Sequence, residues 1–250
     1  MKGWIAVEEK LNNPVTTFVC FDIETTGLNP QQDKIIEIGA VKVIDKKIVE
    51  VFRKLIHPQM KLPAIITNIT GITDQMLEGA EREEIVIPQF LEFTKDFVVL
   101  GHNIMFDYSF IKTAAVRMKM EFNKTGIDTL ELSRHLHKDL ESRSLENMCR
   151  HYQIKNNNAH RAYDDAKATA LLYVQLCNHF FAEHKEMFWP KELSYKVKKS
   201  QPITKKQKNY LIDLLKYHNI DSEQLNDTLT QSEASKWIDQ IILTHGRMNQ

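Results

Sequence analysis

The sequence is poor in the residues that mark several specialised classes of protein. Its cysteines are three in number and far apart, which excludes a disulfide framework and the spacing of a zinc site. With 8 glycines and 7 prolines among 250 residues, the chain is neither collagen-like nor of low complexity. It has no apolar run near the roughly 18 residues of a membrane span, and residues 1–10 lack the apolar segment of a secretory signal. We therefore expect a cytoplasmic protein without a membrane partner.

An excess of charge of either sign is also missing. The chain has 33 basic and 33 acidic residues, and its net charge is zero. This excludes a protein that coats nucleic acid by bulk charge, but not an enzyme that acts on nucleic acid through a few local positive groups. The length and the 42% content of hydrophobic residues allow one or two domains with a sizeable core.

The hydrophobic pattern predicts an α/β fold with a mixed sheet flanked by helices. Short apolar runs rich in β-branched residues predict strands at 17–23, 35–44, 48–56, 97–101 and 126–129. Apolar stripes at helical spacing predict helices at 88–96, 104–118, 129–138, 144–151 and 164–181, with short helical turns within 62–78. Pro88 is expected at the first position of its helix, where proline is well tolerated.

The composition changes after residue 182. Residues 194–212 contain six lysines and no acidic residue, which indicates a lysine-rich linker over 183–203. Capping-box patterns that begin at Thr204 and Thr230 predict two helices, and therefore a small all-helical module over 204–250. Because about 45 residues are few for independent stability, we expect this module to rest on the main domain or on a partner. The main domain is predicted at 15–182, after an N-terminal extension at 1–14.

Two carboxylates are predicted at the end of the first strand. Asp22 and Glu24 are two residues apart, so that their side chains point to the same face. Two adjacent like charges repel each other, and the arrangement is costly unless a cation lies between them. Mg²⁺ prefers such carboxylate oxygens together with water and phosphate oxygens. Taken alone, the pair fits an ordinary strand end in solvent equally well.

A third carboxylate follows the fourth predicted strand. This strand ends at Gly101, and Asn103 is expected to cap the next helix, with Asp107 in its first turn. There the helix dipole stabilises a negative charge, and taken alone this site fits a purely structural role.

A histidine and a fourth carboxylate lie near the start of the last helix of the main domain. Residues five apart on one helix point about 140° away from each other. His160 is therefore expected in the loop before the helix and Asp165 in its first turn. Taken alone, both fit a surface position, but together the three sites offer four carboxylates and one histidine. Hydrolysis of a phosphodiester by two metal ions needs such a set, and a neutral histidine can accept a proton near pH 7.

Five segments of the chain occur in the order and spacing of a known family. They are F-D-I-E-T-T-G-L, I-I-E-I-G-A-V, I-T-G-I-T, G-H-N-x-x-F-D and H-R-A-x-x-D-A. Over about residues 15–182 the chain resembles the DEDDh family of 3′–5′ exonucleases. It looks most like the proofreading (epsilon) subunit of bacterial DNA polymerase III and the exonuclease domain of the Gram-positive replicative polymerase. The resemblance implies a ribonuclease H-like fold and an exonuclease domain at 15–182.

The resemblance also implies roles for individual residues. His160 would be the general base, and two Mg²⁺ ions, with Mn²⁺ able to substitute, would be held by four carboxylates: Asp22, Glu24, Asp107 and Asp165. The substrate-binding residues that the resemblance implies are Thr25, Thr26, Gly27, Leu28, Asn103, Phe106 and His160. Packing in the core is the plain alternative for Leu28 and Phe106.

The expected function is metal-dependent 3′–5′ hydrolysis that releases nucleoside monophosphates from single-stranded or frayed DNA ends, in proofreading or repair. Trimming of RNA 3′ ends by the same chemistry is one alternative. A non-catalytic binding subunit of a polymerase is another. A DNA polymerase is a possible partner through the C-terminal segment.

Overall fold

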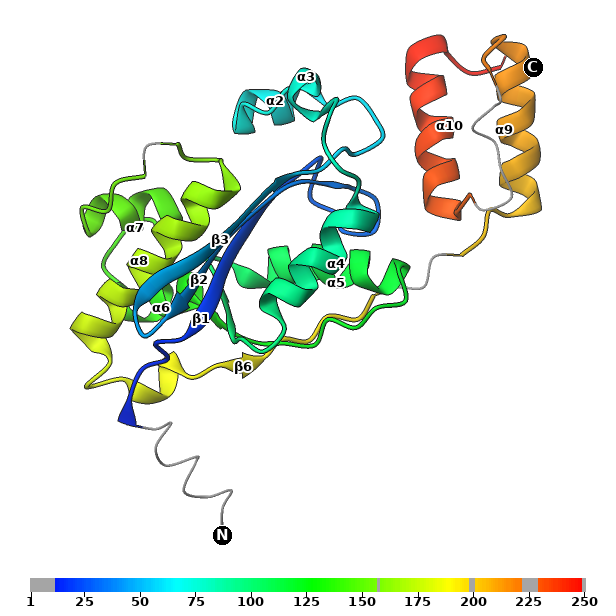
Figure 1. Ribbon diagram of the computed structural model, residues 1–250. Coiled ribbons are helices and arrows are strands. Elements are labelled where there is room, and N and C mark those ends of the chain that lie inside the picture. Colours follow the sequence, from blue (N-terminus) through cyan, green and yellow to red (C-terminus); the bar gives the residue numbers. More distant parts are fainter. Residues whose placement is uncertain (1–11, 157, 198–200, 222–228, 249–250) are drawn as a thin grey trace. The chain divides into compact units, whose positions relative to one another are not determined.

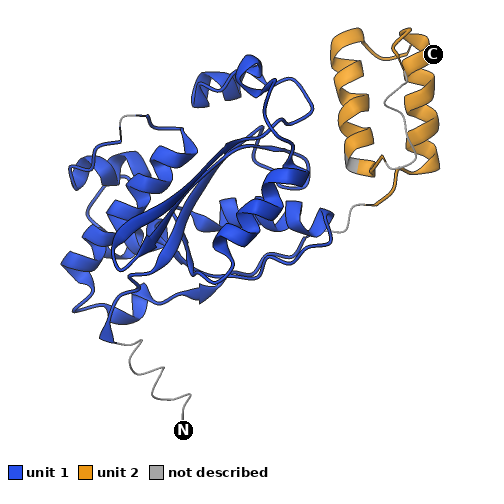
Figure 2. Ribbon diagram, in the orientation of Figure 1, with its two compact units in different colours: residues 1–197 blue, residues 198–250 orange. Residues whose placement is uncertain are grey.

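The computed structural model describes residues 12–156, 158–197, 201–221 and 229–248. They divide into two compact units, Met1–Val197 and Lys198–Gln250 (Figure 2). Most of the predicted N-terminal extension at 1–14 lies outside the described residues.

The first unit contains a six-stranded mixed sheet in the order β3-β2-β1-β4-β5-β6 (Figure 1). Its strands are β1 (Phe18–Thr25), β2 (Ile35–Ile44), β3 (Lys47–Leu55), β4 (Val99–Gly101), β5 (Thr125–Asp128) and β6 (Lys191–Glu192). The first three strands are antiparallel neighbours. β4 lies parallel to β1, and β5 lies parallel to β4, while β6 is antiparallel to β5. The predicted mixed sheet is confirmed.

Helices cover both faces of this sheet (Figure 1). The first unit contains α2 (Ala64–Thr70), α3 (Asp74–Leu77), α4 (Glu83–Thr94), α5 (Ile104–Arg117), α6 (Thr129–Leu136), α7 (Leu145–His151), α8 (Ala162–Phe180) and the 3₁₀ turn η1 (Lys185–Phe188). The helices expected from apolar stripes begin and end within two residues of these bounds, with one exception at α4.

The central strand β1 is apolar on both faces because both faces are covered. Val19 and Phe21 belong to the core formed with α4 and α5, whereas Phe18 and Cys20 belong to the core formed with α8. A strand buried on both faces has a continuous apolar run instead of an alternating one. Successive side chains still point to opposite faces of the sheet, and those of the even-numbered residues of β1 point toward α8.

The expected helix start at Pro88 is wrong. α4 begins at Glu83, and Pro88 lies inside the helix. The acidic residues Glu83 and Glu84 occupy the first turn, where the helix dipole stabilises their charge. Pro88 removes one backbone hydrogen bond in the middle of the helix, and the burial of Ile87 and Phe90 in the core outweighs that loss.

The predicted linker at 183–203 begins too early. Residues 185–188 form η1, and β6 pairs with β5 at the edge of the sheet. Phe188 and Leu193 are buried in the cores of the first unit. The compact unit therefore continues to Val197.

The second unit is all-helical, as predicted. It contains α9 (Lys205–Tyr217) and α10 (Gln231–His245), and each helix begins with the expected capping box, at Thr204 and Thr230. Its buried core is small and consists of Leu211, Leu214, Leu215, Ala234 and Ile241.

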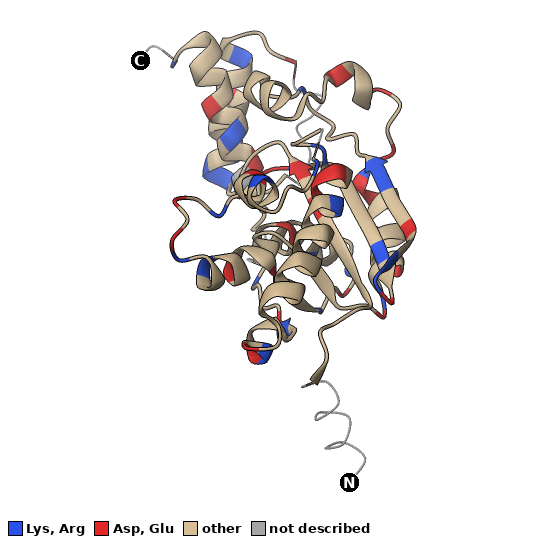
Figure 3. Ribbon diagram, turned by 90° about the vertical axis from the view of Figure 1, so that its left-hand side faces the viewer, with Lys and Arg blue, Asp and Glu red and all other residues tan. Residues whose placement is uncertain are grey.

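Basic and acidic residues are interspersed along the elements of both units (Figure 3). This distribution agrees with the zero net charge, and any contact with nucleic acid would have to rest on local geometry. Among the helices that the structure describes, none is long and apolar enough to cross a membrane.

A glycine on β2 lets the start of α8 approach the sheet. A Cβ atom at Gly39 would collide with the backbone of Ala162 and Tyr163. Because both neighbours are backbone, neither can move aside without shifting the helix.

Gly39→Ala is expected to lower the free energy of unfolding by at least about 1–3 kcal/mol, the usual cost of overpacking. Urea denaturation followed by circular dichroism measures this difference. Gly79→Ala is the matched control, because a Cβ at Gly79 has no heavy atom within 4 Å. Equal stabilities of the two variants would contradict the close packing at Gly39.

Candidate active site

The predicted catalytic residues converge at one edge of the sheet. Since β1 and β4 are parallel, their carboxyl ends meet there, beside the first turn of α8. A cavity of about 300 Å³ lies at this edge, and it is lined by all five residues expected to be catalytic: Asp22, Glu24, Asp107, His160 and Asp165. The cavity is also lined by Asn103 and Phe106.

Three of the carboxylates are positioned by β1. Asp22 and Glu24 continue the α8-facing series of Phe18 and Cys20 at the end of the strand. Asp107, in the first turn of α5, is 3% exposed, and its Oδ1 accepts a hydrogen bond of 3.0 Å from the backbone N–H of Ile23. The third carboxylate is thus attached to the residue between the other two.

The fourth carboxylate is held by the loop before α8. Asp165 accepts hydrogen bonds from Asn156 Nδ2 at 2.6 Å and from the backbone N–H of His160 at 2.8 Å. His160 lies in that loop, as expected, with an exposed side chain and a left-handed backbone at φ 65°. A non-glycine residue persists in this conformation only where its surroundings require it.

The donor set fits a divalent cation. Ligand atoms of Glu24, His160 and Asp165 lie within 4.8 Å of one another, and Asp22 and Asp107 line the same cavity. Carboxylate oxygens are the ligands that Mg²⁺ and other hard cations prefer.

The electrostatics of the cavity point the same way. Burial raises the pKa of Asp22, Asp107 and Asp165 above the usual range for aspartate. Burial and the charges of Asp165 and Glu37 raise the pKa of Glu24 to about 8. Bringing these carboxylates together is unfavourable while they are ionised, and a bound cation would relieve the repulsion.

The end of β1 and the loop after it carry the first group of predicted substrate-binding residues. Thr25 Oγ1 donates to the carbonyl of Gly27 at 2.6 Å, and Thr26 Oγ1 accepts from the backbone N–H of Lys34 at 2.9 Å. These bonds shape the loop from within and leave Leu28 at its tip 85% exposed. Core packing of Leu28, the plain alternative, is therefore wrong.

Two further predicted substrate-binding residues lie at the start of α5. Phe106 is half-buried and packs against Phe110 with 5.0 Å between the ring centroids, so it combines core packing with a place in the cavity wall. Asn103 occupies the N-cap position of α5, as expected. Its backbone is left-handed at φ 71°, and its side chain makes no capping bond, while its N–H donates to Asp128 Oδ1 at 2.9 Å.

Two residues at the site were not predicted to have a role. Asn156 holds Asp165, and its amide in a run of three asparagines carried no signal. Glu37 is 3% exposed and bonds with Arg161 beside the cavity. A charged residue inside the apolar run 35–44 was a detectable signal, because a buried charge needs a partner.

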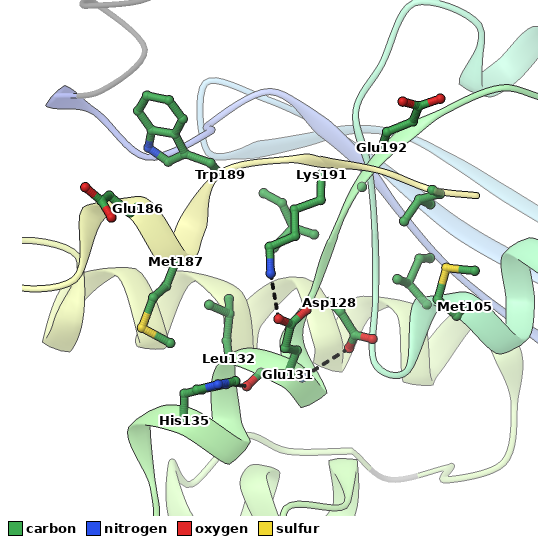
Figure 4. Close-up of a pocket in the computed structure, with 14 residues that line it drawn as sticks. Met105, Asp128, Glu131, Leu132, His135, Glu186, Met187, Trp189, Lys191 and Glu192 are labelled. Carbon is green, nitrogen blue, oxygen red and sulfur yellow. Dashed lines mark hydrogen bonds and ion pairs between the residues drawn. The ribbon is translucent and has the colours of Figure 1, made fainter. Parts of the chain in front are cut away.

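A second cavity, of about 400 Å³, lies between β5, α6 and β6 (Figure 4). There Lys191 pairs with Glu131 at 2.6 Å, and Asp128 caps α6 through the N–H of Leu130 at 2.8 Å. Asp128 and Glu131 are thus engaged in structural contacts, and the five predicted catalytic residues do not line this cavity. The residues expected to be catalytic are thus gathered in the smaller cavity.

Residues 19–173 match a family model described as an exonuclease. The chain belongs to the exonuclease family. The matched residues include every side chain that lines the smaller cavity. They end before the second unit.

Relatives of this exonuclease-family chain include much longer DNA polymerases. It is 46% identical over 159 residues to the PolC-type DNA polymerase III of Caldanaerobacter subterraneus subsp. tengcongensis, covering 64% of this chain and 11% of that protein. It is 41% identical over 160 residues to the PolC-type DNA polymerase III of Thermotoga maritima, covering 64% of this chain and 12% of that protein. The chain therefore spans about one-ninth of the length of these polymerases.

Solved structures with the same fold are also exonucleases. Exonuclease X, in complex with 5′ overhanging duplex DNA, has a TM-score of 0.56 and 26% identity, over 68% of this chain and 96% of that one. E. coli exonuclease I, in complex with a dA16 oligonucleotide, has a TM-score of 0.59 and 19% identity, over 70% of this chain and 42% of that one. The expected ribonuclease H-like fold is confirmed, and family membership supports a nuclease function.

Proposed function

We propose that this protein is a metal-dependent 3′–5′ exonuclease of the DEDDh type that releases nucleoside monophosphates from single-stranded or frayed DNA ends. One observation carries the proposal: four carboxylates and a histidine from three separate segments line one cavity of about 300 Å³. Without a cation this grouping is unfavourable, because burial and mutual repulsion raise the pKa values of the carboxyl groups.

In this proposal the carboxylates and the histidine have separate roles. Asp22, Glu24, Asp107 and Asp165 would hold two divalent cations. Bound there, the cations would activate the attacking water and offset the negative charge that develops on the phosphate. His160 would accept the proton of that water, because its side chain lines the cavity and histidine is the most frequent general base in enzymes.

The exposed loop tip would contact the end of the strand. Leu28 offers an apolar surface that is 85% exposed, on a loop whose shape is fixed by Thr25 and Thr26. Stacking of bases on such groups tolerates any sequence, which suits an enzyme that removes each nucleotide in turn. Thr25, Thr26, Gly27, Asn103 and Phe106 complete the proposed contacts to the terminal nucleotides.

DNA is the favoured substrate, with Mg²⁺ as cofactor and Mn²⁺ as substitute. The named relatives are DNA polymerases, and exonuclease X has been solved with DNA. A polymerase is the proposed partner, through the C-terminal residues that the family match does not include, and replication or repair in the cytoplasm is the proposed setting.

The chemistry is tested with two 5′-labelled single strands of the same sequence, one of DNA and one of RNA. We expect a ladder that shortens from the 3′ end with Mg²⁺, disappears in EDTA, and forms faster on DNA. Faster shortening of RNA would instead identify an enzyme that trims RNA. If neither strand is shortened with Mg²⁺ or Mn²⁺, catalysis is contradicted and the non-catalytic alternative is favoured.

A further inference from the structure

Glu37 is a buried acidic residue that the reaction, as proposed, does not use. It lies on β2 and is 3% exposed. In the pairing of β1 with β2 it stands directly opposite Glu24, one of the proposed metal ligands. Residues directly opposite each other in a sheet share a face, so Glu37 adds a further negative charge beside the carboxylate cluster.

The charge of Glu37 is engaged by the loop before α8. Arg161 donates to it twice, from Nη2 to Oε1 at 2.8 Å and from Nε to Oε2 at 3.1 Å. The backbone N–H of Ala162 donates to Oε2 at 3.1 Å. A two-pronged contact between arginine and a carboxylate fixes direction as well as distance.

Two further contacts hold the same stretch of chain. Gly39 admits the backbone of Ala162 and Tyr163 against β2. The guanidinium of Arg53 on β3 lies over the ring of Tyr163, 4.5 Å from its centroid. Residues 161–163 are therefore each attached to the sheet.

This attachment sits next to the proposed general base. His160 directly precedes Arg161 and has a left-handed backbone, and its N–H donates to Asp165 Oδ2. The strained residue is thus held on one side by Asp165 and on the other by the contact of Arg161 with Glu37. Such a conformation persists where neighbouring contacts determine it from both sides.

We propose that the ion pair of Glu37 and Arg161 is a positioning device for catalysis, which holds the loop so that His160 and Asp165 face Glu24 across the cavity. This inference rests on the proposed nuclease function. An ordinary stabilising role is the alternative, yet a buried ion pair contributes little net stability, because desolvation offsets the attraction.

Glu37→Gln is the informative variant, because it keeps the shape of the side chain and an acceptor for the Ala162 N–H but removes the charge. We expect kcat on single-stranded DNA to fall by about a hundred-fold, the effect of a small misplacement of a reacting group, with KM nearly unchanged. Arg161→Lys keeps the positive charge but loses the two-pronged contact of the guanidinium. Its kcat should lie between those of the wild type and Glu37→Gln.

Glu50→Gln is the matched control. Glu50 lies on β3 and pairs with Lys42 at 2.5 Å, and it does not line the cavity. It should leave kcat unchanged. Thermal unfolding of each variant shows whether the protein is folded at the assay temperature, and a loss of kcat that only follows the unfolded fraction would overturn the proposal.

A double-mutant cycle with His160→Ala separates positioning from a general effect. If Glu37 acts through His160, Glu37→Gln should cost much less activity in the His160→Ala background than in the wild type. Full additivity of the two losses would overturn the proposal.

NMR of the histidine side chains in EDTA gives a readout that needs no activity. The His160 resonance is assigned by its loss in His160→Ala, and we expect it to shift or broaden in Glu37→Gln but not in Glu50→Gln. An unchanged His160 resonance would overturn the positioning role. If the wild type proved to have no nuclease activity, the proposed function would fail, while this spectrum would still decide whether the pair positions His160.

Discussion

Asp22→Asn is expected to abolish nuclease activity and, in the same protein, to raise its thermal stability in the absence of metal. The activity should fall about a thousand-fold or more, because the variant removes a charged oxygen ligand from the centre of the proposed site. The stability should rise because burial and the charges of Asp107, Asp165 and Glu24 disfavour the ionised form of Asp22. A neutral amide of the same shape avoids that cost.

The two effects are measured on one preparation, by the DNA ladder with Mg²⁺ and by thermal unfolding in EDTA at neutral pH. Glu50→Gln is the control for the loss of a carboxylate that lies outside the cavity. A loss of activity together with a gain in thermal stability would show that Asp22 destabilises the folded protein and is needed for the reaction. A variant that retains activity would rule out the proposed metal site.

The stability of the metal-free protein is expected to decrease as the pH rises, and Mg²⁺ should remove most of this decrease. Burial and neighbouring charges raise the pKa of Glu24 from 4.5 to about 8, and the pKa values of Asp22, Asp107 and Asp165 also lie above their usual range. Between pH 4.5 and about 8, Glu24 therefore binds more protons in the folded state than in the unfolded state. The contribution of Glu24 to stability is complete below pH 4.5 and is lost as the pH rises through about 8.

The decisive range for this measurement is pH 6.5 to 8. Burial lowers the pKa of His102 and His137 below 6.5. Below this pH their contribution to the stability of the fold therefore increases as the pH rises. Burial also lowers the pKa of Lys124 to about 8, which adds an opposite trend at higher pH.

Urea denaturation at several pH values, in EDTA and in Mg²⁺, gives the slope of the free energy of unfolding against pH. Asp22→Asn should flatten the slope in EDTA, since it removes one of the repelling charges. A slope of zero in EDTA, or the same slope with and without Mg²⁺, would contradict a cation site formed by these carboxylates.

The sequence alone determined most of the elements and the set of residues with catalytic potential. The spacing of apolar residues placed β1, β2, α5 and α8 within two residues of their observed bounds, because local periodicity reflects which faces are buried. The two capping boxes at Thr204 and Thr230 were equally local, since each joins residues three apart. The place of His160 in the loop before α8 followed from helix geometry.

Only the tertiary structure decided the features that depend on distant partners. The short strand β6 forms because Lys191 and Glu192 pair with Gly126 and Thr125, and two residues carry no periodicity from which a strand could be predicted. Glu37 is paired with Arg161, which lies 124 positions further along the chain. The N–H of Asn103 donates to Asp128, which lies 25 positions further along the chain. Local patterns determine which face of an element is buried, whereas the contacts that orient the site arise only when those faces pack together.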